Sequence, residues 1–219
     1  MVLEMILARE CKYKGSLGEF TYNTEDFEII NKYTPFGVIP TLHYRGTETD
    51  GTKIKIPNGL RDGSYLFENT SIQTPPLLPP SLTLANYMFL DCVSLVRGAI
   101  LPHGCVSASF MYAGCRSLTS VPRTPNTLKR AQYMCDGCRL LEEPVLLNDG
   151  IENITGMFRN CASMQHLADV PDSVKEYAHL YRGCKSLRDL LGDAYEETAV
   201  KEFPEKELEP EQEVEVESE

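Results

Sequence analysis

The chain has 219 residues, 42% of them hydrophobic, which allows one or two folded domains and excludes wholesale disorder. Its formal net charge is −11, and much of this lies in residues 201–219, which hold nine Glu but only two Lys. A nearly neutral body with an acidic tail gives no electrostatic reason to expect nucleic-acid binding. The N-terminus has no basic segment ahead of an apolar run, and no stretch approaches the roughly 18 apolar residues of a membrane span. We therefore expect a cytoplasmic protein, or one carried in a virion, without membrane contact.

The first 55 residues do not follow the pattern of the rest and predict a β-rich N-terminal cap. Such a cap is needed because the first unit of a repetitive fold would otherwise expose its apolar edge to water. Apolar and polar residues alternate in four short segments, which predict two hairpins with polar turns. The segments are 18–22 with 27–30, around a turn at 23–26, and 41–44 with 53–56, around a turn at 49–51.

From residue 56 onward one sequence pattern repeats every 22 or 23 residues. Five cysteines stand 23 residues apart, an apolar residue follows each by three positions, and a proline or Asn148 follows the first four by ten. A fixed period of this length is the signature of a solenoid. The proline phrase begins at Pro57, one unit before the first cysteine, so we predict six units. The cysteines are Cys92, Cys115, Cys138, Cys161 and Cys184.

Within each unit the composition predicts a strand, a turn and a helical turn. The segment after the cysteine alternates like a short strand and ends at proline, which fixes a turn. The segment leading into the next cysteine lacks proline and can close as one helical or 3₁₀ turn. Stacked coils of this kind predict a right-handed solenoid of the α/β, β-rich class, with a parallel sheet whose strands lie about 4.8 Å apart. The predicted domains are 1–55 as the cap, 56–193 as the solenoid and 194–219 as a disordered acidic tail.

The repeated phrase resembles the BspA-like class of bacterial leucine-rich repeats. Its closest copy reads Val-Pro-Asp-Ser-Val at residues 170–174 and Arg-Gly-Cys-Lys-Ser-Leu at residues 182–187. The resemblance covers residues 56–191 and implies a leucine-rich-repeat-like solenoid. It also implies a binding role, since members of the class are mostly binding proteins of bacterial surfaces, with copies in protist and phage genomes. This chain departs from the class by having no evident export signal and by carrying an acidic tail.

The cysteines invite a chemical interpretation, which their positions argue against. Thiols on neighbouring coils would lie within disulfide range, and Cys135 and Cys138 have the spacing of a redox or zinc motif. However, Cys135 occupies an aromatic repeat position, the first unit has no cysteine, and no second such motif completes a four-thiolate site. Buried free cysteine packs as a small hydrophobe. We therefore interpret the cysteines as core and expect no cofactor and no metal.

No catalytic motif is recognisable in the sequence. The four His fall at unrelated repeat positions, and neither a nucleophile motif nor a phosphate-binding glycine loop is present. Function must be argued from a site rather than from a fold. We therefore predict a protein that is not an enzyme.

Two sets of repeat positions are candidate binding surfaces. In the first set, the positions between the core residues of the predicted strand vary while the framework repeats, as in repeat proteins that bind extended partners. In the second set, Arg or Lys recurs beside the cysteine and should align into a basic strip on the convex-side turn. A solvated surface without a function would look the same. The candidate partner-binding residues are Arg97, Thr119, Glu142, His166 and Arg188, and the basic strip consists of Arg116, Arg139, Arg159, Arg182 and Lys185.

The favoured function is a non-enzymatic scaffold that binds a partner protein through the solenoid surface. The acidic tail fits a contact with a basic surface, either the chain's own basic strip or another protein. A first alternative is a structural component of a phage particle or another assembly. A second is a phage-type inhibitor of a host nucleic-acid enzyme, whose Glu-Val tail imitates phosphate charge.

Overall fold

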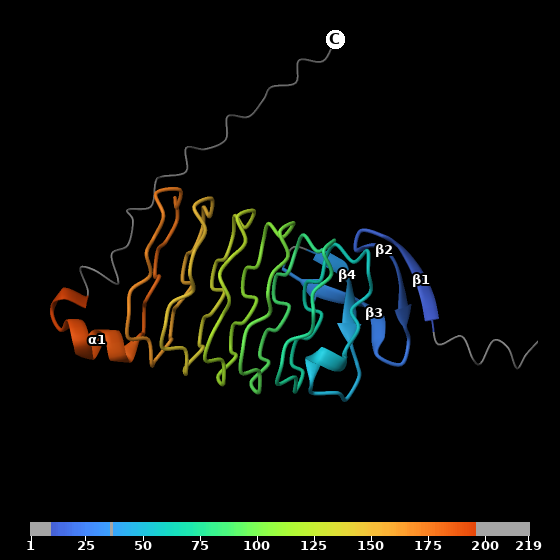
Figure 1. Ribbon diagram of the computed structural model, residues 1–219, viewed down its shortest axis with the longest axis horizontal. Helices are drawn as coiled ribbons and strands as arrows, with labels where there is room; N and C mark the ends of the chain where they lie inside the picture. Colours follow the sequence, from blue (N-terminus) through green and yellow to red (C-terminus); the bar gives the residue numbers. More distant parts are fainter. Residues whose placement is uncertain (1–9, 36, 196–219) are drawn as a thin grey trace, which may run out of the picture.

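The computed structural model describes residues 10–35 and 37–195. Two small antiparallel hairpins are followed by a stack of coils and a short helix, which run from right to left in Figure 1. No helix in these residues is long and apolar enough to cross a membrane. The elements are β1 (Glu10–Gly15), β2 (Gly18–Asn23), β3 (Phe27–Thr34), β4 (Gly37–Tyr44), the 3₁₀ helix η1 (Gly51–Lys53) and α1 (Lys185–Leu191).

The hairpins differ from the predicted ones, because β1 pairs with β2 and β3 pairs with β4. The predicted strand segments at 18–22 and 27–30 are strands, but they belong to different hairpins. Gly18 and Gly37 follow the two connections with φ of 124° and 122°, values that glycine adopts without strain. Residues 53–56 do not form the predicted strand. Instead, the Asp50 side chain accepts a hydrogen bond from the Thr52 amide (3.1 Å), which starts η1.

The hairpins are attached to the first coil through backbone and aromatic contacts. The Arg61 amide donates to the Leu17 carbonyl (2.7 Å), and the Tyr44 amide donates to the Leu66 carbonyl (2.8 Å). The Tyr44 ring lies 5.3 Å from the Phe67 ring, between centroids, and so extends the aromatic core of the coils into the hairpins. The apolar edge of the first coil is therefore covered.

The coils, numbered 1 to 6 from residues 56, 78, 101, 124, 147 and 170, are joined by backbone hydrogen bonds on two sides. On one side, the Thr119 amide donates to the Val96 carbonyl (2.9 Å), and the Gln165 amide donates to the Glu142 carbonyl (2.9 Å). The predicted continuous parallel sheet is not confirmed, since the coils share only isolated parallel bridges. Prolines next to the extended positions remove the donors that a longer ladder needs. On the other side the bridges link Asp62, Leu84, Ser107, Arg130, Asn153 and Glu176 in succession.

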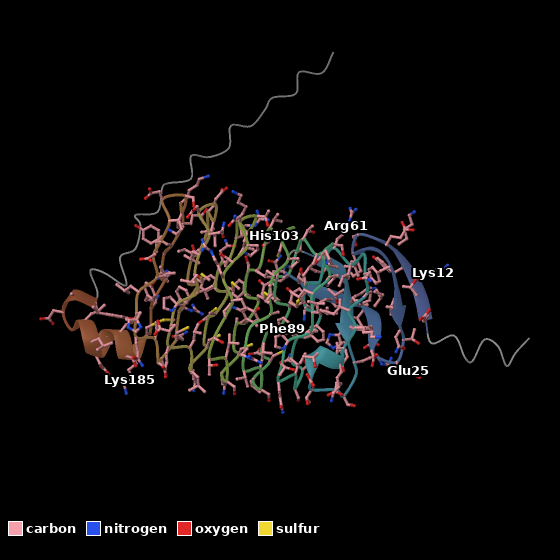
Figure 2. All side chains as sticks on the ribbon, in the orientation of Figure 1. Lys12, Glu25, Arg61, Phe89, His103 and Lys185 are labelled. Carbon is pink, nitrogen blue, oxygen red and sulfur yellow. The ribbon has the colours of Figure 1, made fainter. Side chains whose placement is uncertain are left out.

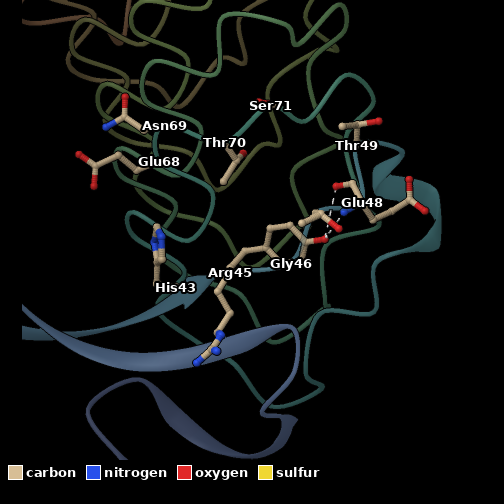
Figure 3. Close-up of a pocket in the computed structure, with 11 residues that line it drawn as sticks. His43, Arg45, Gly46, Glu48, Thr49, Glu68, Asn69, Thr70 and Ser71 are labelled. Carbon is tan, nitrogen blue, oxygen red and sulfur yellow. Dashed lines mark hydrogen bonds between the residues drawn. The ribbon is translucent and has the colours of Figure 1, made fainter.

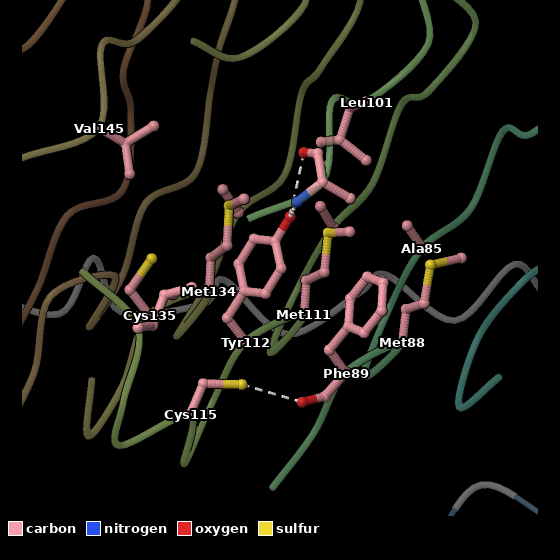
Figure 4. Packing of buried hydrophobic residues seen from close by; sticks show 14 of the residues in the cluster. Ala85, Met88, Phe89, Leu101, Met111, Tyr112, Cys115, Met134, Cys135 and Val145 are labelled. Carbon is pink, nitrogen blue, oxygen red and sulfur yellow. Dashed lines mark hydrogen bonds between the residues drawn. The ribbon is translucent and has the colours of Figure 1, made fainter. Parts of the chain in front are cut away.

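Side chains at the same repeat position form buried columns inside the coils (Figure 4). Met88, Met111 and Met134 are at most 1% exposed, and the Phe89 and Tyr112 rings stack with centroids 5.7 Å apart. Burying each such side chain stabilises the fold by about 1.5–3 kcal/mol relative to leaving it in water. One coil cannot bury these side chains alone, so the core exists only in the stack.

The five cysteines are buried and free, which confirms their interpretation as core. The structure also supplies a reason for cysteine at this position. Each thiol donates to a backbone carbonyl of the preceding coil, as Cys115 does to Phe89 at 3.1 Å (Figure 4). In coil 1, where the cysteine is missing, the Thr70 hydroxyl donates to the Phe67 carbonyl (2.8 Å). Burial raises the pKa of the Cys92 thiol to about 11, so the thiol keeps the proton that it donates. The acceptors are Phe67, Phe89, Tyr112, Cys135 and Phe158.

The segment before each cysteine is a pair of tight turns rather than the predicted helical turn. Its first turn holds an aromatic residue at φ between 53° and 64° in four successive coils, a backbone region that costs such residues about 1 kcal/mol. Stacking offsets this cost, because the half-buried rings form a ladder with centroids 4.7–4.8 Å apart. The position before the cysteine is also left-handed, which explains its glycines. The ladder consists of Tyr65, Tyr87, Phe110 and Tyr133.

At the other end of the stack, α1 and Tyr195 cover coil 6. Leu187 of α1 is buried, and Tyr195 is only 1% exposed. The Tyr195 hydroxyl donates to the Tyr181 carbonyl (2.7 Å) and accepts from the Cys184 amide (3.2 Å). The predicted acidic tail lies outside the described residues from residue 196 onward.

Candidate functional site: an exposed face of the coils

Four of the five predicted partner-binding residues lie on one face of the coils. Arg97, Thr119, Glu142 and His166 are all exposed, and each belongs to a pair of consecutive exposed residues. Backbone hydrogen bonds join the pair at 96–97 to the pair at 119–120, and the pair at 142–143 to the pair at 165–166, and a parallel bridge joins Arg97 to Ser120. We name this surface the binding face. It consists of the pairs at residues 96–97, 119–120, 142–143 and 165–166.

Arg188, the fifth predicted residue, does not belong to the binding face. It lies on α1, where its guanidinium stands 5.2 Å from the centroid of the Tyr195 ring. After Cys184 the chain has no proline and reads Lys-Ser-Leu-Arg-Asp-Leu-Leu, which is rich in helix formers. The repeat pattern therefore ends in a helix where a sixth extended segment was expected.

Charge is unevenly distributed along the binding face. Arg97, in coil 2, forms no ion pair within the described part of the chain. Coil 4 contributes Glu142 and Glu143, and the Glu143 carboxylate lies 3.0 Å from His166 Nδ1. The face is therefore cationic toward coil 2 and anionic at coil 4.

Exposed aliphatic side chains occupy one repeat position beside the binding face in coils 1, 2 and 4, and the exposed Arg123 occupies that position in coil 3. Leu77 is 86% exposed, Ile100 is 73% exposed and Leu146 is 64% exposed, and all three share one repeat position. We name these three residues the apolar band. Sequence reasoning missed them because it assigned recurrent aliphatic residues to the core.

A groove of about 550 Å³ lies where the apolar band meets the binding face, in coils 1 to 3. Gly98 lines this space and is closely packed, since a Cβ there would lie 3.2 Å from the Pro122 ring and 3.2 Å from the Tyr112 hydroxyl. The Tyr112 hydroxyl holds the floor from inside, accepting from the Ala99 amide (2.8 Å) and donating to the Ala99 carbonyl (3.2 Å). We name it the Gly98 groove. Its main lining residues are Pro75, Pro76, Leu77, Arg97, Ile100 and Pro122.

The predicted basic strip is largely present. Arg116, Arg139, Arg182 and Lys185 are exposed, and none of them forms an ion pair within residues 10–35 and 37–195. In Figure 2, Lys185 lies at the edge of the stack opposite Arg61 and His103. Arg159 is different, because its Nε and Nη2 bind the Asp136 carboxylate at 3.0 and 2.7 Å. That carboxylate raises the pKa of Arg159, whose charge is used within the fold rather than presented in the strip.

A second hollow, of about 690 Å³, lies between the end of β4 and coil 1 (Figure 3). Its charged groups are already engaged: Arg45 lies 3.6 Å from Glu28, and Glu48 lies 3.4 Å from Lys53. The described residues contain no cluster of His, Cys, Asp and Glu that could hold a metal ion. This hollow therefore shows no convergent set of groups for chemistry.

The stacked coils, their buried columns and their exposed face define a leucine-rich repeat fold. This chain is similar to a leucine-rich repeat protein from T. pallidum, at 20% identity and a TM-score of 0.55, over 82% of this chain and 96% of that one. A leucine-rich repeat protein from Bacteroides ovatus has 24% identity and a TM-score of 0.45, over 61% of this chain and 40% of that one. No protein-family model and no curated protein matches the chain. At such identities the comparison concerns the fold alone.

Proposed function

We propose that this protein is a non-enzymatic scaffold that binds a partner protein through the binding face and the apolar band. The observation that carries the proposal is the exposure of Leu77, Ile100 and Leu146 along one line of the stack. Aligned aliphatic side chains with a polar border are typical of interaction surfaces, whereas scattered ones need no explanation. A leucine-rich repeat fold supports the proposal in general terms, because solenoids present extended surfaces to their partners.

The dimensions of the face suit an extended segment of a partner. Coils 1 to 5 at a spacing of about 4.8 Å present a surface roughly 20 Å long. About six residues of an extended chain span that length. Their apolar side chains would cover the apolar band, and their polar side chains would meet the binding face.

The proposal is tested by affinity capture from the native source with a triple variant, L77D/I100D/L146D. These side chains are exposed, so their replacement leaves the core intact. We expect the variant to lose a partner that the wild-type protein retains. V38D is the matched control, because Val38 is 54% exposed on β4, away from the apolar band. A partner retained equally by the triple variant would contradict the proposal.

We also propose the finer features of the architecture. They are a BspA-like type of repeat, a right-handed solenoid over residues 56–193, a cap over residues 1–55 and an acidic tail over residues 194–219. The repeated proline and cysteine phrase supports the first of these. The thiol bond from each cysteine to the preceding coil supports a shared coil geometry.

We also propose that residues 201–219 contact the basic strip of their own chain. Four exposed cations of the strip have no ion pair within the described residues, and the tail is strongly acidic. Tyr195, the last described residue, is bonded to coil 6, which carries Arg182 and Lys185 of the strip. Deleting residues 201–219 should strengthen binding to a poly-glutamate column and increase its salt sensitivity. Unchanged retention would contradict contact in cis.

A further inference from the structure

We propose that the Gly98 groove is a specificity pocket for one kind of partner segment. The segment is an extended peptide in which an aliphatic residue stands within two positions of an acidic residue. This proposal rests on the proposed function and names the chemistry of the partner. It is carried by the shape, the rigidity and the charge of the groove.

The shape of the groove suits an aliphatic side chain. Leu77 and Ile100 are 86% and 73% exposed at its edges, and the rings of Pro75, Pro76 and Pro122 line it. Its volume of about 550 Å³ lies within the usual range of ligand sites. An aliphatic side chain placed there would cover apolar surface that is otherwise in contact with water.

The groove is rigid before any partner arrives. Its floor is fixed by the Gly98 amide, which donates to the Ser120 carbonyl (2.8 Å), and by the two hydrogen bonds between Tyr112 and Ala99. Its walls contain prolines, whose φ angles are fixed by the ring. Little order therefore has to be imposed on binding, which favours affinity. Prolines also lack an amide donor, so recognition here depends on side chains rather than on strand addition.

The charge around the groove favours an acidic partner. Arg97 lines the groove, and Arg123 is exposed one coil beyond Ile100 at the same repeat position. Neither forms an ion pair within the described ranges. On the N-terminal side, the Asp50 carboxylate lies 3.8 Å from the Lys53 amine and accepts from the Thr74 hydroxyl (2.8 Å). A carboxylate next to an aliphatic anchor would therefore find an unpaired guanidinium.

The chain's own residues 213–217 alternate Glu and Val and are a rival occupant with similar chemistry. The observations favour a partner segment over this tail. Tyr195, the last described residue, is bonded to coil 6, which carries Arg182 and Lys185 of the basic strip, whereas the groove lies in coils 1 to 3. An acidic tail is therefore expected to meet the strip first.

The test is a selection of displayed random seven-residue peptides on the full-length protein, with R97E and I100D screened in parallel. We expect enriched peptides to carry an aliphatic residue within two positions of Asp or Glu. R97E should shift the preference from acidic to basic residues, and I100D should abolish enrichment. Both side chains are exposed, so both variants should fold. R116E, a charge reversal on the basic strip, is the matched control and should keep the wild-type preference.

A labelled selected peptide then gives the affinity by fluorescence polarisation. Its Kd should rise at least tenfold with R97E and with I100D, and less than twofold with R116E. Absence of enriched peptides, or an affinity indifferent to R97E and I100D, would overturn the proposal. A synthetic peptide of residues 208–219 that displaces the selected peptide with the same variant dependence would assign the groove to the tail and also overturn it. If these peptide experiments overturn the groove proposal while L77D/I100D/L146D still loses its partner, the proposed function stands without this pocket.

Discussion

Replacing Tyr112 with Phe tests the support that the core gives to the Gly98 groove. The hydroxyl is buried, accepts from the Ala99 amide at 2.8 Å and donates to the Ala99 carbonyl at 3.2 Å (Figure 4). Ala99 is only 3% exposed, so the substitution leaves two buried backbone groups without this partner. Each such group costs about 1–3 kcal/mol. We therefore predict that Y112F lowers the free energy of unfolding by about 2–6 kcal/mol, a large part of the 5–15 kcal/mol typical of a folded domain.

The assay is urea unfolding followed by far-UV circular dichroism, with thermal unfolding as a second measurement. A loss of this size lowers the midpoint temperature by about 4–24 °C in a chain of this length. Y87F is the matched control, because the Tyr87 ring belongs to the half-buried aromatic ladder and its hydroxyl is not part of the core. We expect Y87F to stay within about 0.5 kcal/mol of the wild-type protein. A Y112F protein that unfolds at the wild-type urea concentration, with an unchanged slope, would refute the reasoning.

Three further predictions follow from burial, backbone conformation and charge. In the folded protein only the exposed Cys11 should react quickly with a thiol reagent at pH 8, because the other thiols are buried. Burial also raises the pKa of the Cys92 thiol to about 11. Rapid labelling of a second thiol would contradict this prediction. G114A should destabilise the fold more than G192A in urea unfolding. Both glycines have positive φ. A Cβ at Gly114 would lie 2.0 Å from a carboxylate oxygen of Asp91 in the preceding coil, whereas a Cβ at Gly192 would have no atom within 4 Å. The flanking lysines lower the pKa of Glu152, so its stabilising effect should be present at neutral pH and vanish as the pH falls through that lowered value. E152Q should therefore differ slightly from the wild-type protein at pH 7 and match it at pH 2, and a difference only in acid would contradict this assignment.

The core of the coils was predictable from the sequence because the period places equivalent residues above one another. Met88, Phe89 and Cys92 recur at fixed offsets, and any column that is apolar in every copy must face inward. The donor role of the thiols was not predictable, since it depends on the position of a carbonyl in the neighbouring coil. The extent of the parallel sheet was overestimated. The sequence shows the alternation typical of strands, but it does not show how few backbone hydrogen bonds form between coils beside the prolines.

The hairpins show the limit of local patterns more clearly. Alternation identified the segments at 18–22 and 27–30 as strands but did not identify their partners. Gly18 and Gly37 directly follow the two-residue connections and have positive φ values, which glycine adopts without strain. These glycines were visible in the sequence, yet the polar run at 23–26 gave an equally acceptable turn.

The candidate site was predicted in part. Arg97, Thr119, Glu142 and His166 are exposed and aligned because they occupy one repeat position, which the period alone defines. Arg188 was misplaced because the last repeat becomes a helix, a change that depends on where stacking ends. The apolar band and the Gly98 groove could not be derived from periodicity, because a period does not reveal which aliphatic residues remain uncovered.

The thiol bonds between coils have a consequence for how this protein can change in size. Each cysteine supplies the donor for the coil before it, and each coil supplies an acceptor for the one after, so every junction has the same thiol bond. A duplicated stretch of 23 residues would therefore form this bond with both of its neighbours. Only the hairpins and α1 are specific to the ends. The length of the surface offered to a partner is thus set by the number of repeat copies. Copies can be gained or lost without changing the residues that decide what is bound.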